Sequence, residues 1–272
     1  MGRGMYAKIP TIFLFPSDYF NPKAVDEAFL EQAKSLQNAG FETAVISLES
    51  LSTTSPKSAP KLSHGSDVVY RGWMLSPSDY NLLVNIINNT GACAFTSLSE
   101  YLAAHYLPNW YPQIKDLTPE TKFYSMDDDL ESELQVLGWE RFFIKDYVKS
   151  LKTSIGSIIE RPSDIKTVVQ EMQKFRGTIE GGLCVRRVED FVEDSERRYF
   201  VIHGQPFAAR EDENVPPIVY ECAKKIQSKF FSVDVVERTD GVQRIVEIGD
   251  GQVSDLIGWS AERFAFGWSS NG

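Results

Sequence analysis

The chain has 272 residues, a formal net charge of −10 and a pI near 4.9. Nucleic-acid-binding proteins usually show the opposite charge balance, so DNA or RNA is not expected as the main partner. No apolar run approaches the roughly 20 residues that a membrane-spanning helix needs. Three widely spaced cysteines, an odd number, favour free thiols and a cytoplasmic location.

The first 115 residues alternate between strand and helix patterns. Helices are predicted at 23–40 and 76–90, and strands lie around them at 8–15, 41–48, 67–73 and 92–97. Strand, helix and strand at this spacing imply a parallel sheet. Arg71 falls at the carboxyl end of the third strand, where open α/β sheets bind ligands, so it is a candidate anion contact. A surface arginine would fit the position equally well. The aromatic and proline-rich residues 98–118 predict a linker that packs down.

A basic strand opens the second half of the chain. Residues 141–148 have a strand pattern, and Lys145, Lys149 and Lys152 extend into a polar segment. A lysine on a rigid strand beside a polar loop can hold a polyphosphate. The alternative is a basic edge strand that resists aggregation.

An arginine-bearing hairpin is predicted further on. A helix at 163–174 and a strand at 181–192 precede the hairpin at 195–209, and a helix at 216–229 follows it. Alternation places Arg198 on one face of the hairpin together with Glu196. A guanidinium on that face would suit a transferring phosphoryl group. The alternative is a cross-strand ion pair.

The acidic hairpin at 231–255 carries the most informative pattern. Asp240-Gly241 predicts a two-residue type I′ turn, because both central positions of that turn need positive φ. The resulting register sets Glu237 opposite Arg244 and Asp234 opposite Glu247. Like charges directly opposed destabilise a sheet, so a compensating hard cation is expected there. A solvated acidic edge, or one protonated carboxyl, remains as an alternative.

This order of elements resembles the ATP-grasp superfamily, and within it the clade that is named for two arginines and a lysine. The resemblance is carried by YRGW at 70–73, LPNWYP at 107–112, FFIKDYVKS at 142–150 and VEIGDGQVSDL at 246–256. It implies an α/β and α+β fold. A Rossmann-like pre-ATP-grasp domain would span 1–115, and a two-subdomain clamp would follow, with an N-terminal subdomain at 116–185 and a C-terminal subdomain at 186–272.

The resemblance also implies a set of site residues. Asp234 and Glu247 stand thirteen residues apart, as the Mg²⁺-binding pair of the family does. The family pattern Glu-x-Asn is broken by Gly249, so Asp250 is the expected third metal ligand. Arg198 would face the transferring phosphoryl group, and Arg71 would hold the acceptor carboxylate. ATP would be held by Lys145, Lys149, Arg186, Arg187, Val188 and Glu189.

The implied activity is an ATP-dependent carboxylate–amine or carboxylate–thiol ligase that forms an acyl phosphate and uses ATP and Mg²⁺. Its substrates would be small molecules or peptides, and the sequence does not fix the oligomeric state. Two alternatives stay open. One is a non-catalytic ATP-binding regulatory protein, and the other is a kinase-like phosphotransferase that uses the same clamp.

Overall fold

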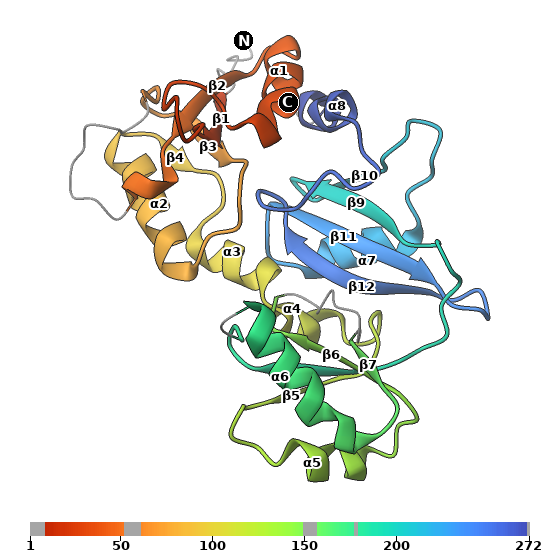
Figure 1. Cartoon of the computed structure of the whole chain (residues 1–272). Coiled ribbons are helices and arrows are strands. Elements are labelled where there is room, and N and C mark those ends of the chain that lie inside the picture. Colours follow the sequence, from red (N-terminus) through yellow and green to blue (C-terminus); the bar gives the residue numbers. More distant parts are fainter. Residues whose placement is uncertain (1–8, 52–60, 149–156, 177–178, 271–272) are drawn as a thin grey trace, which may run out of the picture.

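The computed structural model describes residues 9–51, 61–148, 157–176 and 179–270. Three four-stranded sheets follow one another along the chain, the first parallel and the other two antiparallel (Figure 1). The mixed α/β and α+β class expected from the sequence is thereby confirmed. Every helix among the described residues is too short or too polar to span a bilayer.

The first sheet has the strand order β2-β1-β3-β4. Its strands are β1 (Thr11–Pro16), β2 (Glu42–Ile46), β3 (Asp67–Tyr70) and β4 (Cys93–Ala94). The 3₁₀ turn η1 (Glu27–Phe29) and helix α1 (Leu30–Asn38) connect the first two strands, a further turn η2 (Leu48–Ser50) follows β2, and α2 (Pro77–Asn89) precedes β4. The parallel sheet predicted from the strand–helix–strand pattern is therefore present.

The segment expected to be a linker that packs down consists of two helices. Helices α3 (Leu98–His105) and α4 (Leu107–Ile114) lead from the first sheet to the second (Figure 1). Ser97 and Glu100 form a complete capping box at the start of α3, which satisfies its first N–H groups. Prolines at helix starts are well tolerated, and Pro108 lies in the first turn of α4. Pro108 therefore begins a helix and does not break one.

The second sheet has the strand order β5-β8-β6-β7. Its strands are β5 (Thr121–Tyr124), β6 (Phe142–Asp146), β7 (Ile158–Ile159) and β8 (Leu183–Arg187). Helices α5 (Leu130–Leu137) and α6 (Ile165–Arg176) lie against it, the second preceded by the turn η4 (Pro162–Asp164). The strand and helix patterns of the sequence predicted β6, β8 and α6 but not β5, β7 or α5. The predicted subdomain boundary at residue 185 falls within β8.

The third sheet has the strand order β10-β9-β11-β12. Its strands are β9 (Arg197–Ile202), β10 (Gln205–Phe207), β11 (Phe230–Glu237) and β12 (Gln243–Asp250). Helix α7 (Pro217–Lys225) packs on one face, and α8 (Ala261–Ser270) covers only the apolar end of the other. Phe200 and Phe230 contact α8, whereas Arg198 and Asp234, further along the same two strands, extend beyond it. This uncovered end of the sheet carries the charged side chains.

The acidic hairpin forms, but its turn differs from the prediction. The Arg238 N–H donates to the Val242 carbonyl at 2.8 Å, so the loop has three residues, and of these only Gly241 has positive φ (83°). This loop shifts the ladder by one, and Arg244 faces Val236, so the expected pairing with Glu237 is wrong. A bulge that leaves Val246 unmatched then restores the register.

Beyond the bulge, Asp234 lies opposite Glu247, as predicted. The positive-φ two-residue turn occurs instead in the β9–β10 hairpin, at His203 (φ 50°) and Gly204 (φ 77°).

Candidate active site

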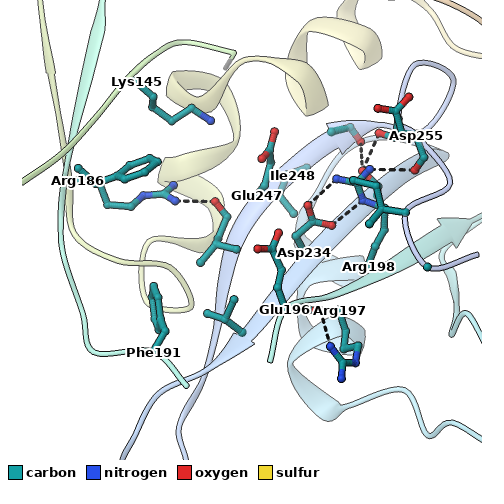
Figure 2. A pocket seen from close by; sticks show the side chains of 18 of the residues that line it. Lys145, Arg186, Phe191, Glu196, Arg197, Arg198, Asp234, Glu247, Ile248 and Asp255 are labelled. Atoms are coloured by element: carbon teal, nitrogen blue, oxygen red, sulfur yellow. Dashed lines mark hydrogen bonds and ion pairs between the residues drawn. The ribbon is translucent and has the colours of Figure 1, made fainter. Parts of the chain in front are cut away.

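A cleft of about 1860 Å³ is lined by the second and third sheets, with residues 72–74 contributing from the end of the first. The sequence-predicted residues that line it are Lys145, Arg186, Arg187, Val188, Glu189, Arg198, Asp234 and Glu247. Figure 2 shows several of them from close by. Lys149, also predicted, lies outside the described residues.

One wall of the cleft presents a row of three charged residues on neighbouring strands. Asp234 of β11 lies between Arg198 of β9 and Glu247 of β12. Arg198 donates two hydrogen bonds to Asp234, from Nε to Oδ1 at 2.8 Å and from Nη2 to Oδ2 at 2.6 Å (Figure 2). The cross-strand ion pair left open in the sequence analysis is therefore present. It neutralises one of the two opposed carboxylates and leaves Glu247 beside it.

Burial and charge oppose each other within this row. Burial raises the pKa of Asp234, and Glu247 adds to the rise, while the Arg198 guanidinium works against it. Burial lowers the pKa of Arg198, but the hydrogen bonds to Asp234 and the negative charges of Asp234, Glu247 and Asp255 together outweigh that effect, so the net direction is upward. Asp234 is 3% exposed. Two carboxylates and one guanidinium leave a net negative charge, which suits a further cation.

The opposite wall is basic. Lys145 of β6 and Arg186 of β8 are only 4% and 5% exposed, yet both line the cleft. Figure 2 shows them on the far side of the cleft from Asp234. Burial lowers the pKa of Arg186 to about 10, with Glu247 opposing, so the guanidinium stays charged at neutral pH.

Arg186 is held in place but not fully satisfied. Its Nη1 donates to the carbonyl of the bulge residue Val246 at 2.6 Å, and its guanidinium lies 5.9 Å from the centre of the Trp110 ring. Its Nη2 has no hydrogen-bond partner among the described residues. A buried guanidinium nitrogen with an open donor fits an anion in the cleft.

The last residue of β8, Arg187, lines the cleft together with Val188 and Glu189 of the segment that follows. Glu189 accepts two hydrogen bonds from Arg244, both at 2.9 Å, so this segment is fastened to β12. Arg244 therefore joins the two walls at the rim of the cleft, a role that its predicted pairing with Glu237 did not anticipate.

Two predicted site residues do not line the cleft. Arg71 is 1% exposed and donates to the carbonyls of Gly251 and Gln252, each at 3.1 Å. Asp250 is fully buried, its Oδ1 accepts from Gln252, and burial raises its pKa to about 7. Strand alternation explains the Asp250 placement, because it lies an odd number of residues from Glu247. Arg71 thus links the end of β3 to the segment after β12, Asp250 is bonded to Gln252 of that segment, and neither residue lines the cleft.

Two serines in the cleft, Ser232 and Ser254, were not among the predicted site residues, and their hydroxyl oxygens lie 2.8 Å apart. Ser232 precedes Asp234 by two residues, so strand alternation alone could have identified it. Among the described residues no group of three His, Cys, Asp or Glu side chains is suited to holding a metal ion.

Comparisons with solved structures find the same fold in several ligases. The D-cycloserine synthetase DcsG matches with a TM-score of 0.63 at 12% identity, over 96% of this chain and 99% of that one. The macrocyclase MdnC from Microcystis aeruginosa MRC, bound with precursor peptide MdnA, matches with 0.62 at 11%, over 96% and 100%. The D-alanine-D-alanine ligase from Coxiella burnetii matches with 0.62 at 13%, over 97% of each chain. At such low identity these matches show the fold.

No curated protein matches the chain at a significant level. A family model matches residues 136–266, which hold Lys145, Arg198, Asp234 and Glu247. The model describes an ATP-grasp domain, family 3 of the clade named for two arginines and a lysine. Residues 136–266 therefore belong to the ATP-grasp superfamily, as a domain of that clade.

Proposed function

We propose that the protein is an ATP-dependent ligase that activates a carboxylate as an acyl phosphate and joins it to an amine or a thiol. One observation carries the proposal: a single cleft sets the opposed pair Asp234 and Glu247 against the buried cations Lys145 and Arg186. The superfamily and the ligase fold support the same conclusion.

The residues of the cleft fit ATP and Mg²⁺. The open Nη2 of Arg186 and the ammonium group of Lys145 suit phosphate oxygens. Asp234 and Glu247 offer the carboxylate oxygens that Mg²⁺ prefers. Arg187, Val188 and Glu189, at the rim, would contact the nucleoside. When bound, Mg²⁺ would neutralise charge on the phosphate groups.

The bonds in this reaction form and break between the substrates, with little covalent participation by the protein. A substrate carboxylate oxygen attacks the γ-phosphorus, the bond to the bridging oxygen breaks, and ADP leaves with the electron pair. The amine nitrogen or thiol sulfur then attacks the acyl carbon, phosphate leaves, and the nucleophile loses its proton. Lys145 and Arg186 would stabilise the phosphate charge, and Arg198 would hold Asp234 in place.

The acceptor side of the cleft lies toward the first sheet. Trp73 and Met74 line this end together with Ser254 and Asp255 from the segment after β12. We place the carboxylate and the nucleophile here, and no longer at Arg71. The solved structures with this fold include enzymes named for small molecules and one bound to a precursor peptide, so both substrate classes belong in a screen.

A substrate screen tests the proposal. The protein is incubated with ATP, Mg²⁺ and hydroxylamine, and with amino acids, other small carboxylic acids and peptides in turn. We expect one class to stimulate ADP release and to yield a hydroxamate, because hydroxylamine traps an acyl phosphate. ADP release with a stable phosphorylated product and no hydroxamate would indicate a kinase-like phosphotransferase. ATP binding without turnover across the whole panel would indicate a regulatory binder. Either result contradicts the ligase.

A further inference from the structure

Ser232 occupies the position beside the carboxylate pair on the same face of the third sheet. The ladder sets Ser232 opposite Gly249 and Asp234 opposite Glu247, with no irregularity between these two pairs. Residues two apart on a strand share a face, so a serine and a glycine extend the carboxylate pair by one step. All four residues line the cleft.

The hydrogen bonds around Ser232 leave its oxygen as an acceptor. Ser254 Oγ donates to the Asp250 carbonyl at 2.8 Å and lies 2.8 Å from Ser232 Oγ. A hydroxyl has one proton, so the Ser254 bond to the Asp250 carbonyl leaves Ser232 as the donor to Ser254, at 2.8 Å and in preference to its longer contact of 3.5 Å with the Gly249 carbonyl. In that arrangement, no described residue donates a hydrogen bond to Ser232 Oγ. Its lone pairs are thus open to a cation or to a ligand that donates.

Gly249 provides the room for this hydroxyl pair. A Cβ at position 249 would lie 2.8 Å from Ser254 Oγ and 3.0 Å from Ser232 Oγ, too close for either to stay in place. The backbone does not require glycine here, because Gly249 is not among the glycines with positive φ. A glycine in a strand interior costs stability and often marks a close approach. Here the close approach is that of two hydroxyl groups at the carboxylate pair.

We propose that Ser232 Oγ is the third protein oxygen of the divalent-cation site, beside Asp234 and Glu247. The inference rests on the proposed function, since it assumes that these carboxylates hold the metal. Ser232 is 2% exposed and lies two residues from Asp234 on the same face of β11, so its lone pairs face little solvent and a bound cation would satisfy them. Hydroxyl groups of Ser and Thr coordinate Mg²⁺ in phosphate-binding loops, so the chemistry is available.

A change of metal preference tests the assignment directly. The affinities for Mg²⁺ and Cd²⁺ are measured by calorimetry in the presence of a non-hydrolysable ATP analogue. Ser232→Cys places a soft sulfur at the position, so we expect Mg²⁺ to bind more weakly and Cd²⁺ more tightly, and their affinity ratio to shift by about tenfold or more. Ser66→Cys is the matched control, because Ser66 is fully buried in the first sheet region and does not line the cleft. It should leave the ratio unchanged.

Two further variants distinguish an error in the Ser232 assignment from an error in the metal site itself. Glu247→Gln should lose the metal whatever Ser232 does. If Glu247→Gln loses it and Ser232→Cys keeps the wild-type ratio, the Ser232 assignment is wrong and the metal site stands. If Glu247→Gln binds the metal normally, the metal site of the proposed function is itself wrong. Should Ser232→Cys fail to fold, Gly249→Ala gives an independent test. It should weaken Mg²⁺ binding by displacing the hydroxyl groups, and an unchanged affinity would overturn the inference.

Discussion

Asp234 lies opposite the like-charged Glu247 on one side and the oppositely charged Arg198 on the other. The sequence predicts an acidic pair that needs a compensating cation, and in the structure the Arg198 guanidinium is one such cation. The pair could be found from the sequence because hairpin pairing is local. The Arg198 contact could not be fixed, because it joins strands that are separated by a whole helix. A bidentate partner fixes the orientation of Asp234 and leaves Glu247 as the carboxylate with no hydrogen bond to a described side chain.

Asp250 gives a pH-dependence that can be measured. Its buried carboxyl titrates with a pKa of about 7, whereas the unfolded chain titrates near the ordinary value of about 4. Above pH 4 the unfolded state therefore releases a proton that the folded state keeps, so this group lowers stability as the pH rises from about 4 to 7. We expect Asp250→Asn to flatten that part of the profile, with thermal unfolding followed at several pH values. The same slope in both proteins would show that Asp250 does not titrate as described.

At the scale of elements, the acidic hairpin could be predicted only in part from the sequence. Asp240-Gly241 indicated a turn and the turn is there, but its three-residue form changes the pairing of every residue up to the bulge. The bulge is stabilised from outside the hairpin. The Ile245 N–H donates to the Leu117 carbonyl, and Arg186 donates to the Val246 carbonyl. A local pattern does not contain these contacts, and the correct Asp234–Glu247 pairing results from two offsets that cancel.

Other elements carried signals that were available but unused. The pattern Ser97-x-x-Glu100 is a capping box and predicts α3. Leu130, Leu134 and Leu137 have helical spacing and precede Gly138, which takes the left-handed C-cap conformation of α5. The strand β7 has two residues and, among the described residues, pairs only with β6, so its formation depends on tertiary contacts that no local pattern shows.

Arg244 and Glu237 provide a paired test of the corrected register. Arg244→Ala removes two hydrogen bonds to Glu189 and two to backbone carbonyls, so we expect a loss of about 2 to 3 kcal/mol in the free energy of unfolding. Glu237 is exposed and faces Gln243, so Glu237→Ala should change stability by less than about 0.5 kcal/mol. Urea unfolding measures both. Equal losses in the two variants would favour the pairing that the structure excludes.

At the scale of the whole molecule, α8 joins the first and third sheets. Its Trp268 ring lies 5.0 Å from Phe13 of β1 and 4.9 Å from Phe230 of β11, both in edge-to-face contact. The sequence predicted an amphipathic element here but not its partners, because they come from opposite ends of the chain. This packing holds the first sheet, whose following residues 72–74 line the cleft, against the third sheet that carries Asp234 and Glu247.

Truncation of a side chain on this helix should therefore affect the whole molecule. Trp268 is 4% exposed, and Trp268→Ala is expected to lower the free energy of unfolding by about 3 to 5 kcal/mol. Phe266, on the same helix, is 51% exposed, so Phe266→Ala should have little effect. Denaturant unfolding followed by far-UV circular dichroism measures the difference. A Trp268→Ala protein as stable as Phe266→Ala would show that α8 does not hold the two sheets together.

The most direct measurement is the Mg²⁺ dependence of nucleotide binding. In calorimetric titrations with a non-hydrolysable ATP analogue, Mg²⁺ should tighten binding to the wild-type protein by about tenfold or more. Glu247→Gln should remove that gain while the protein stays folded. Glu237→Gln, the matched change on the same hairpin away from the carboxylate pair, should keep it. If Glu247→Gln shows the same Mg²⁺ gain as wild type, then Asp234 and Glu247 do not form the metal site of an ATP-dependent ligase.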